Sequence, residues 1–204
     1  MHINWLGRTA LKIQAKPQDQ DVTIVIDPYR SESGNSPRSL SPQIALFSHG
    51  LEDAITLSGN PFVLSGPGEC EIKGVLVTGV QGRNAKEVLF RLDVENVSLA
   101  HLGIANTTLT NAQIDALQGV DVLCLPVGGT VGFDAETAAK VANILEPHII
   151  IPLAHQSPVD PKAAPVHVFL KEIGLSADKP ESKVIVKKKD LPEEETKVVV
   201  LIVE

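Results

Sequence analysis

The stretch MHINWLGRTALKIQAK, Met1 to Lys16, has apolar residues that alternate with polar ones on both sides of Gly7. Alternation with a period of two is typical of a half-buried β-strand, and a glycine between two such runs favours a turn. The stretch therefore predicts a strand, a turn and a second strand. The apolar run VTIVIDP, Val22 to Pro28, predicts a third strand soon afterwards.

Strands dominate the first half of the chain. We expect one strand in IALFS (44–48), two strands around Gly66-Pro67-Gly68 in PFVLSGPGECEIKGVLVTGV (61–80), and two strands broken near Glu95-Asn96 in EVLFRLDVENVSLAHLG (87–103). In this half of the chain the signal is almost entirely that of β-structure, with short spacing and turn residues between the runs.

Helices and strands alternate in the second half. Apolar residues at helical spacing and good capping residues predict helices in TNAQIDALQG (110–119), DAETAAKVANILEP (134–147) and APVHVFLKEIG (164–174). Strands are expected in VDVLCLPVGG (120–129), HIIIPLAH (148–155), KVIVKKK (183–189) and KVVVLIVE (197–204). The pattern predicts an α+β fold with one domain over residues 1–204, in which two sheets pack face to face with helices outside.

Composition excludes several classes of function. The 204 residues carry a formal net charge of −7, which argues against a nucleic-acid partner. No apolar run approaches the roughly 20 residues of a membrane helix, and the N-terminus lacks the apolar core of a signal peptide. Cys70 and Cys124 do not form a disulfide framework. We therefore expect a cytoplasmic protein without membrane contact.

Several strings occur in the order found in one known family. WLGRTALKI (5–13), IDP (26–28), SGPGECEIKG (65–74), and VDVLCLPVGG with EPHIIIP (146–152) together resemble the metallo-β-lactamase fold. The branch they resemble is that of bacterial metal-dependent hydrolases related to ascorbate-6-phosphate lactonases. The resemblance implies an αββα sandwich with a metal site at one edge, formed by loops from both sheets.

The resemblance places the family's HxHxDH metal motif on the turn FSHGLEDA (47–54). His49 and Asp53 match the first and third motif positions, whereas Leu51 and Ala54 occupy the other two. Aliphatic side chains offer no lone pair to a metal ion. The turn therefore keeps half of the ligands that the motif requires.

The later ligands implied by the resemblance are also incomplete. His101 matches a family histidine, Ile104 occupies the position of the bridging aspartate, and His155 falls one residue late for the last ligand. His49 and His101 would remain at one metal, and Asp53 and His155 at the other. Because a catalytic zinc normally has three protein ligands, a dinuclear hydrolase is disfavoured.

Three interpretations stay open. The preferred one is a divergent member with an incomplete metal site: a pseudoenzyme or binding protein that holds an unknown small molecule in the old cleft, or a protein partner. The alternative is a single-metal hydrolase of a lactone, ester or phosphoester, in which His49, His101 and His155 hold zinc, iron or manganese and Asp53 is a ligand or a weak candidate for the catalytic base. The third is a homo-oligomer assembled through sheet edges such as VVVLIVE (198–204).

Other polar residues near the motif have two readings each. Arg8 replaces the histidine of the family's WLGHS turn, so it could hold an anion or pair with Asp27. Ser48 beside His49 is disfavoured as a nucleophile because adjacent side chains rarely meet in the required geometry. Glu52 is expected to face solvent. The sequence does not show whether the loop 29–42 covers the cleft.

Overall fold

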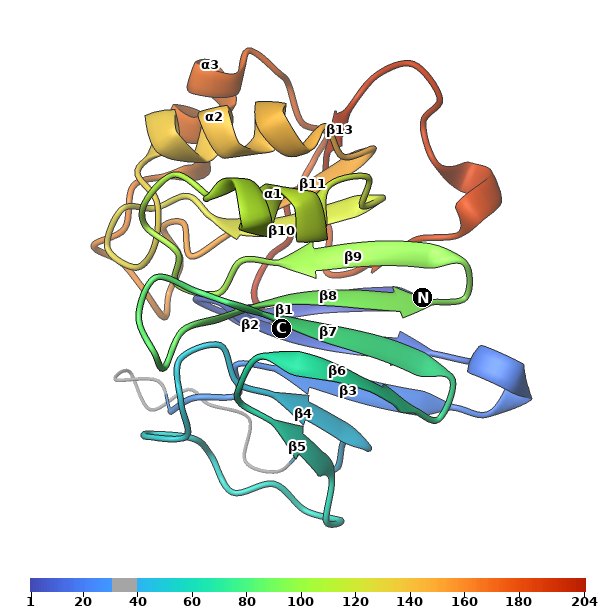
Figure 1. Cartoon of the computed structure of the whole chain (residues 1–204). Helices are drawn as coiled ribbons and strands as arrows, with labels where there is room; N and C mark the ends of the chain where they lie inside the picture. The colour runs from blue at the N-terminus through green and yellow to red at the C-terminus, as the bar shows by residue number, and fades with distance from the viewer. Residues whose placement is uncertain (31–39) are drawn as a thin grey trace.

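A computed structural model describes residues 1–30 and 40–204, and its two β-sheets pack face to face (Figure 1). The first sheet has the strand order β12–β1–β2–β3–β4–β5. Its strands are His2–Gly7 (β1), Ala10–Ala15 (β2), Val22–Ile26 (β3), Ile44–Leu46 (β4), Phe62–Leu64 (β5) and Val184–Ile185 (β12). Most of the predicted loop 29–42 lies outside the described residues, so its relation to the cleft stays open.

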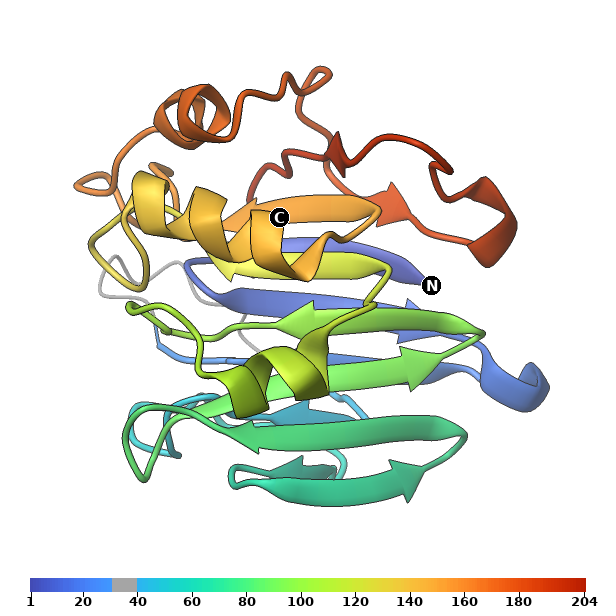
Figure 2. The same cartoon turned by 45° about the horizontal axis from the view of Figure 1, so that its top comes forward.

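The second sheet has the order β13–β11–β10–β9–β8–β7–β6. Its strands are Gly68–Ile72 (β6), Val75–Gln81 (β7), Val88–Val94 (β8), Val97–His101 (β9), Val122–Pro126 (β10), Ile149–Leu153 (β11) and Lys197–Val198 (β13). The described helices are Asn111–Leu117 (α1), Ala135–Leu145 (α2) and Val166–Ile173 (α3), with short 3-10 turns at Pro17–Asp19 and Lys188–Asp190. The α-helices lie over this second sheet (Figure 2). The predicted α+β sandwich is confirmed.

Two apolar cores hold these layers together. The larger core lies between the sheets and takes alternate residues of most strands, as in β1, where Ile3 and Trp5 are buried and His2 is exposed. The smaller core lies between the second sheet and the helices, and it includes Phe133 and Phe169. Both are built mainly from Val, Ile, Leu and Ala, as the scarcity of aromatic residues requires.

The expected number of strands in residues 61–80 was wrong. The stretch 61–80 forms three strands instead of two, because Gly66-Pro67-Gly68 carries the chain from β5 in one sheet to β6 in the other. Gly79 in β7 permits this close approach, because a Cβ on Gly79 would lie only 2.6 Å from the carbonyl oxygen of Gly66. The expected terminal strands are present as β12 in the first sheet and β13 in the second. Residues 198–201 are buried, so this segment is part of the core.

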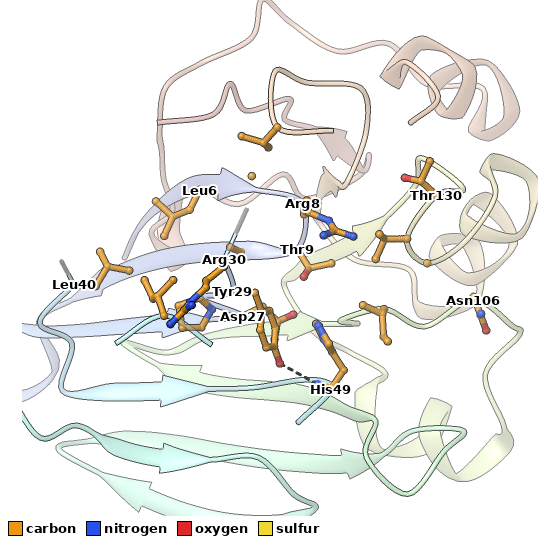
Figure 3. A pocket seen from close by; sticks show the side chains of 18 residues that line it. Leu6, Arg8, Thr9, Asp27, Tyr29, Arg30, Leu40, His49, Asn106 and Thr130 are labelled. Carbon is orange, nitrogen blue, oxygen red and sulfur yellow. Dashed lines mark hydrogen bonds between the residues drawn. The ribbon is translucent and has the colours of Figure 1, made fainter. Parts of the chain in front are cut away.

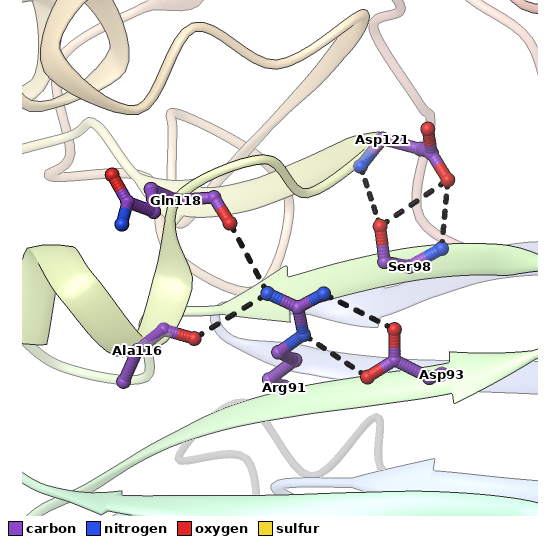
Figure 4. Close-up of polar contacts among 6 residues, drawn as sticks. All are labelled: Arg91, Asp93, Ser98, Ala116, Gln118 and Asp121. Carbon is purple, nitrogen blue, oxygen red and sulfur yellow. Dashed lines mark hydrogen bonds and ion pairs between the residues drawn. The ribbon is translucent and has the colours of Figure 1, made fainter.

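Polar contacts fix α1 and the start of β10 on the second sheet (Figure 4). Thr110 caps α1 as predicted, in a capping box with Gln113. At the other end of α1, Arg91 Nη1 donates to the carbonyls of Ala116 (3.4 Å) and Gln118 (3.1 Å), while Asp93 binds the rest of the guanidinium. These contacts fix α1 on the second sheet, in which His101 is the last residue of β9.

Candidate functional site

A cleft of about 390 Å³ opens at the edge of the sandwich (Figure 3). The turn between β1 and β2 and the segments after β3, β4, β9 and β10 surround it. Its polar lining comprises Arg8, Thr9, Asp27, Tyr29, Arg30, His49, Asn106 and Thr130. Its apolar lining includes Leu6, Leu40, Ile55, Ile104, Val131 and Val159. A volume of this size with few polar groups is typical of a small-molecule site.

His49 lies in this cleft and is held by a chain of hydrogen bonds. Ser48 donates its backbone N–H to Asp27 Oδ1 and its hydroxyl to Oδ2, both at 2.7 Å. Ser48 Oγ lies 3.0 Å from Nδ1 of His49. Ser48 has already used its single hydroxyl proton, so its oxygen accepts the Nδ1–H of His49, and Nε2 of His49 carries the free lone pair.

Burial is the main cause that lowers the pKa of His49. The negative charge of Asp27 raises that pKa, and the positive charge of Arg8 lowers it further. The imidazole stacks on Tyr29 with ring centroids 4.0 Å apart. Burial also raises the pKa of Tyr29, whose hydroxyl donates to the carbonyl of Gly50. His49 is therefore a neutral base beside a protonated phenol near pH 7.

His101 is fully buried, and backbone groups occupy both of its ring nitrogens. The N–H of Gly103 donates to Nδ1 at 3.2 Å. Nδ1 is thus the acceptor, and Nε2–H donates to the carbonyl of Thr9 at 2.8 Å. The bond to Thr9 joins β9 of the second sheet to the first hairpin. With both nitrogens engaged and burial lowering its pKa, His101 has no lone pair to offer a metal.

Gly103 also links this histidine to the Ser48 chain. Its φ is +54°, and a Cβ at this position would lie 2.5 Å from Ser48 Oγ. Only glycine fits both restrictions. The loop that binds His101 therefore packs directly on the residue that orients His49.

His155 follows β11 and lies against Trp5, with ring centroids 4.4 Å apart. Its Nδ1 donates to the carbonyl of Gln156 at 3.2 Å, which leaves Nε2 unprotonated. Among the described residues no group bonds this buried Nε2. Burial lowers the pKa of His155. His155 does not line the cleft that contains His49.

The remaining motif residues point elsewhere. Asp53 is exposed, has a φ of +63° and does not line the cleft; its backbone carbonyl accepts the N–H of Arg30 at 2.9 Å. Glu52 pairs with Lys86 at 2.6 Å on the surface, as expected. Leu51 is exposed as well. The turn thus directs only His49 into the cleft.

A metal ion does not fit this donor set. The described residues contain no group of three His, Cys, Asp or Glu side chains that could hold an ion. Of the four residues considered as ligands, His49 and His155 retain a free nitrogen, His101 is bound to the backbone on both sides, and Asp53 faces solvent. Within residues 1–30 and 40–204, three protein ligands for a catalytic zinc do not converge.

Sequence reasoning missed the role of Ser48 and Asp27. Ser48 does meet His49, but it is 1% exposed and donates to Asp27, so it supports the imidazole and is no nucleophile. Pairing with Asp27 was one of the two roles considered for Arg8, and it is absent from the ion pairs of the described residues. In the sequence, Asp27 and Ser48 each stand at the end of an apolar run that predicts a strand. The structure shows that these strands, β3 and β4, are adjacent and parallel, which brings the two side chains together behind His49.

The two face-to-face sheets with an edge cleft define a metallo-β-lactamase-type sandwich. Residues 2–154 match the family described as a β-lactamase superfamily domain. The chain belongs to this superfamily, whose fold here is that of the metallo-β-lactamases. This confirms the resemblance drawn from the sequence.

Individual relatives agree with this assignment. A metal-dependent hydrolase of Methanopyrus kandleri is 23% identical over 222 residues, which cover 87% of this chain and 95% of the relative. A crystal structure from Thermotoga maritima, described as a Zn-dependent hydrolase of the metallo-β-lactamase superfamily, has a TM-score of 0.82 and 28% identity, and the match covers 99% of this chain and 100% of that one. A metallo hydrolase of Ignicoccus hospitalis has a TM-score of 0.66 at 14% identity, covering 91% and 99% of the two chains.

Proposed function

We propose that this chain is a metal-independent member of a hydrolase family, which binds a small molecule in the edge cleft without dinuclear hydrolysis. The observation that carries the proposal is the engagement of both His101 nitrogens by backbone groups. A metal at His101 would have to break one of these buried bonds, which would leave a backbone group unpaired. Leu51, Ala54 and Ile104 at ligand positions support the same conclusion.

Zinc binding tests this proposal. Protein purified without chelator should contain far less than one equivalent of zinc, iron or manganese, and calorimetric titration with zinc should show no saturable binding. The His49→Ala variant should behave like the parent chain, because His49 alone cannot hold an ion. One equivalent of tightly bound metal that is lost in His49→Ala would contradict the proposal.

One observation favours a second function, a single-metal hydrolase of a lactone, ester or phosphoester. Nε2 of His49 and Nε2 of His155 both carry a lone pair without a partner among the described residues. Both could serve a metal if the loop after β11 moved. Metal content that falls in both His49→Ala and His155→Ala, together with ester hydrolysis that depends on the metal, would establish this function.

A further inference from the structure

The chain of hydrogen bonds behind His49 determines what its imidazole presents to the cleft. Asp27 can only accept, so the Ser48 hydroxyl donates to it and the His49 Nδ1–H donates to Ser48. Nε2 of His49 has no bonding partner among the described residues and belongs to a side chain that lines the cleft (Figure 3). The cleft therefore contains a hydrogen-bond acceptor whose tautomer is fixed from behind.

Arg8 provides the complementary charge. Its backbone is held from two sides, because its carbonyl accepts the Trp5 indole N–H at 2.8 Å and the Ala154 N–H at 2.9 Å. This holds Arg8 at a φ of +47°, a conformation that is costly for a residue other than glycine. The guanidinium of Arg8 lines the cleft and makes no hydrogen bond or ion pair with the described residues.

A partly buried guanidinium that forms no ion pair with any described residue favours binding of an anion. Its planar fork of N–H groups matches the two oxygens of a carboxylate. Asp27 forms no ion pair with Arg8, and its buried carboxylate binds Ser48 twice. Within residues 1–30 and 40–204, no side chain binds the Arg8 guanidinium in place of a ligand.

We propose that the cleft binds a small hydroxycarboxylate. Arg8 binds its carboxylate, and Nε2 of His49 accepts a hydrogen bond from its hydroxyl group. This inference rests on the metal-independent function proposed above and names its ligand class. The apolar side chains of Leu6, Ile104 and Val159 offer a surface for the aliphatic part of the ligand. The cation of Arg8 matches the carboxylate of such a ligand, and the acceptor nitrogen of His49 matches its hydroxyl.

Three aliphatic acids of similar size test the proposal: 2-hydroxyhexanoate, 2-methoxyhexanoate and hexanoate, titrated calorimetrically into the full chain with EDTA present. The hydroxy acid should bind about 10-fold more tightly than the methoxy acid, because one hydrogen bond in a desolvated site is worth about 1.4 kcal/mol. The methoxy oxygen cannot donate to Nε2. Equal affinity of the two acids, or no binding of any acid, would overturn the proposal.

Two variants separate the roles of the residues. Arg8→Gln should weaken all three acids by 10-fold or more, whereas Arg83→Gln, the same change of charge on an exposed residue outside this cleft, should leave them unchanged. In Asp27→Asn the new amide donates to Ser48, the Ser48 hydroxyl then donates to His49 Nδ1, and Nε2 acquires the proton. This variant should lose the preference for hydroxy over methoxy while it still binds acids through Arg8.

The outcomes distinguish this inference from the proposed function. If zinc does not bind and the acids do not bind either, only the ligand class is wrong. If zinc binds with one equivalent, the proposed function itself fails. Affinity for the acids that is unaffected by Arg8→Gln in a variant that melts like the parent chain would also overturn the assignment of Arg8.

Discussion

His101→Ala should lower the free energy of unfolding by about 3 kcal/mol or more. The substitution leaves a cavity at a fully buried position and removes the partners of two backbone groups, the N–H of Gly103 and the carbonyl of Thr9. The bond to Thr9 also joins the two sheets across 92 positions in sequence. Urea or thermal unfolding followed by circular dichroism measures the loss.

The matched control is His167→Ala, which removes an exposed histidine from α3. Its effect should stay within about 0.5 kcal/mol. If the chain is metal-independent, as proposed, adding EDTA to the parent chain should leave its stability unchanged. A small effect of His101→Ala would contradict the structural role of its two hydrogen bonds, and a loss of stability that EDTA reproduces in the parent chain would indicate that His101 is a metal ligand.

Asp27→Ala should cost about 2–4 kcal/mol of stability. Asp27 is buried and accepts two hydrogen bonds from Ser48, so its removal leaves a buried N–H and a buried hydroxyl without their acceptors. Its φ of +52° adds strain for alanine, because aspartate and asparagine tolerate this region better. Chemical unfolding of the two proteins under identical conditions gives the difference.

Asp27→Asn serves as the control for shape. It keeps an acceptor for the Ser48 N–H and a residue suited to positive φ, so its cost should stay near 1 kcal/mol. If Asp27→Ala and Asp27→Asn destabilise equally, the negative charge matters more than the geometry of the two bonds. If neither destabilises, the hydrogen-bond chain behind His49 does not support the fold.

Local sequence signals predicted most of the elements. Period-two alternation marked β1 and β2, and capping residues marked the starts of α1 at Thr110 and α2 at Asp134. These features depend on neighbours within a few residues. The change from β5 to the second sheet was missed because a Gly-Pro-Gly turn looks the same whether its strands share a sheet or not.

The candidate site was predictable only in part. The motif comparison identified His49 and His101 and the loss of ligands at Leu51 and Ile104. It could not show what binds the His101 nitrogens, because both partners are backbone groups and backbone groups leave no sequence signal. The same holds for the guanidinium of Arg8, which no described residue binds and whose surroundings depend on segments far apart in the chain.

The ring nitrogens of His101 test the central claim most directly. Long-range ¹H–¹⁵N NMR spectra of the full chain should show one protonated nitrogen, Nε2, and one unprotonated nitrogen, Nδ1, with both signals unchanged when one equivalent of zinc is added. Displacement of either signal by zinc, with loss of the slowly exchanging Nε2–H, would show that His101 coordinates the ion and would contradict a metal-independent cleft.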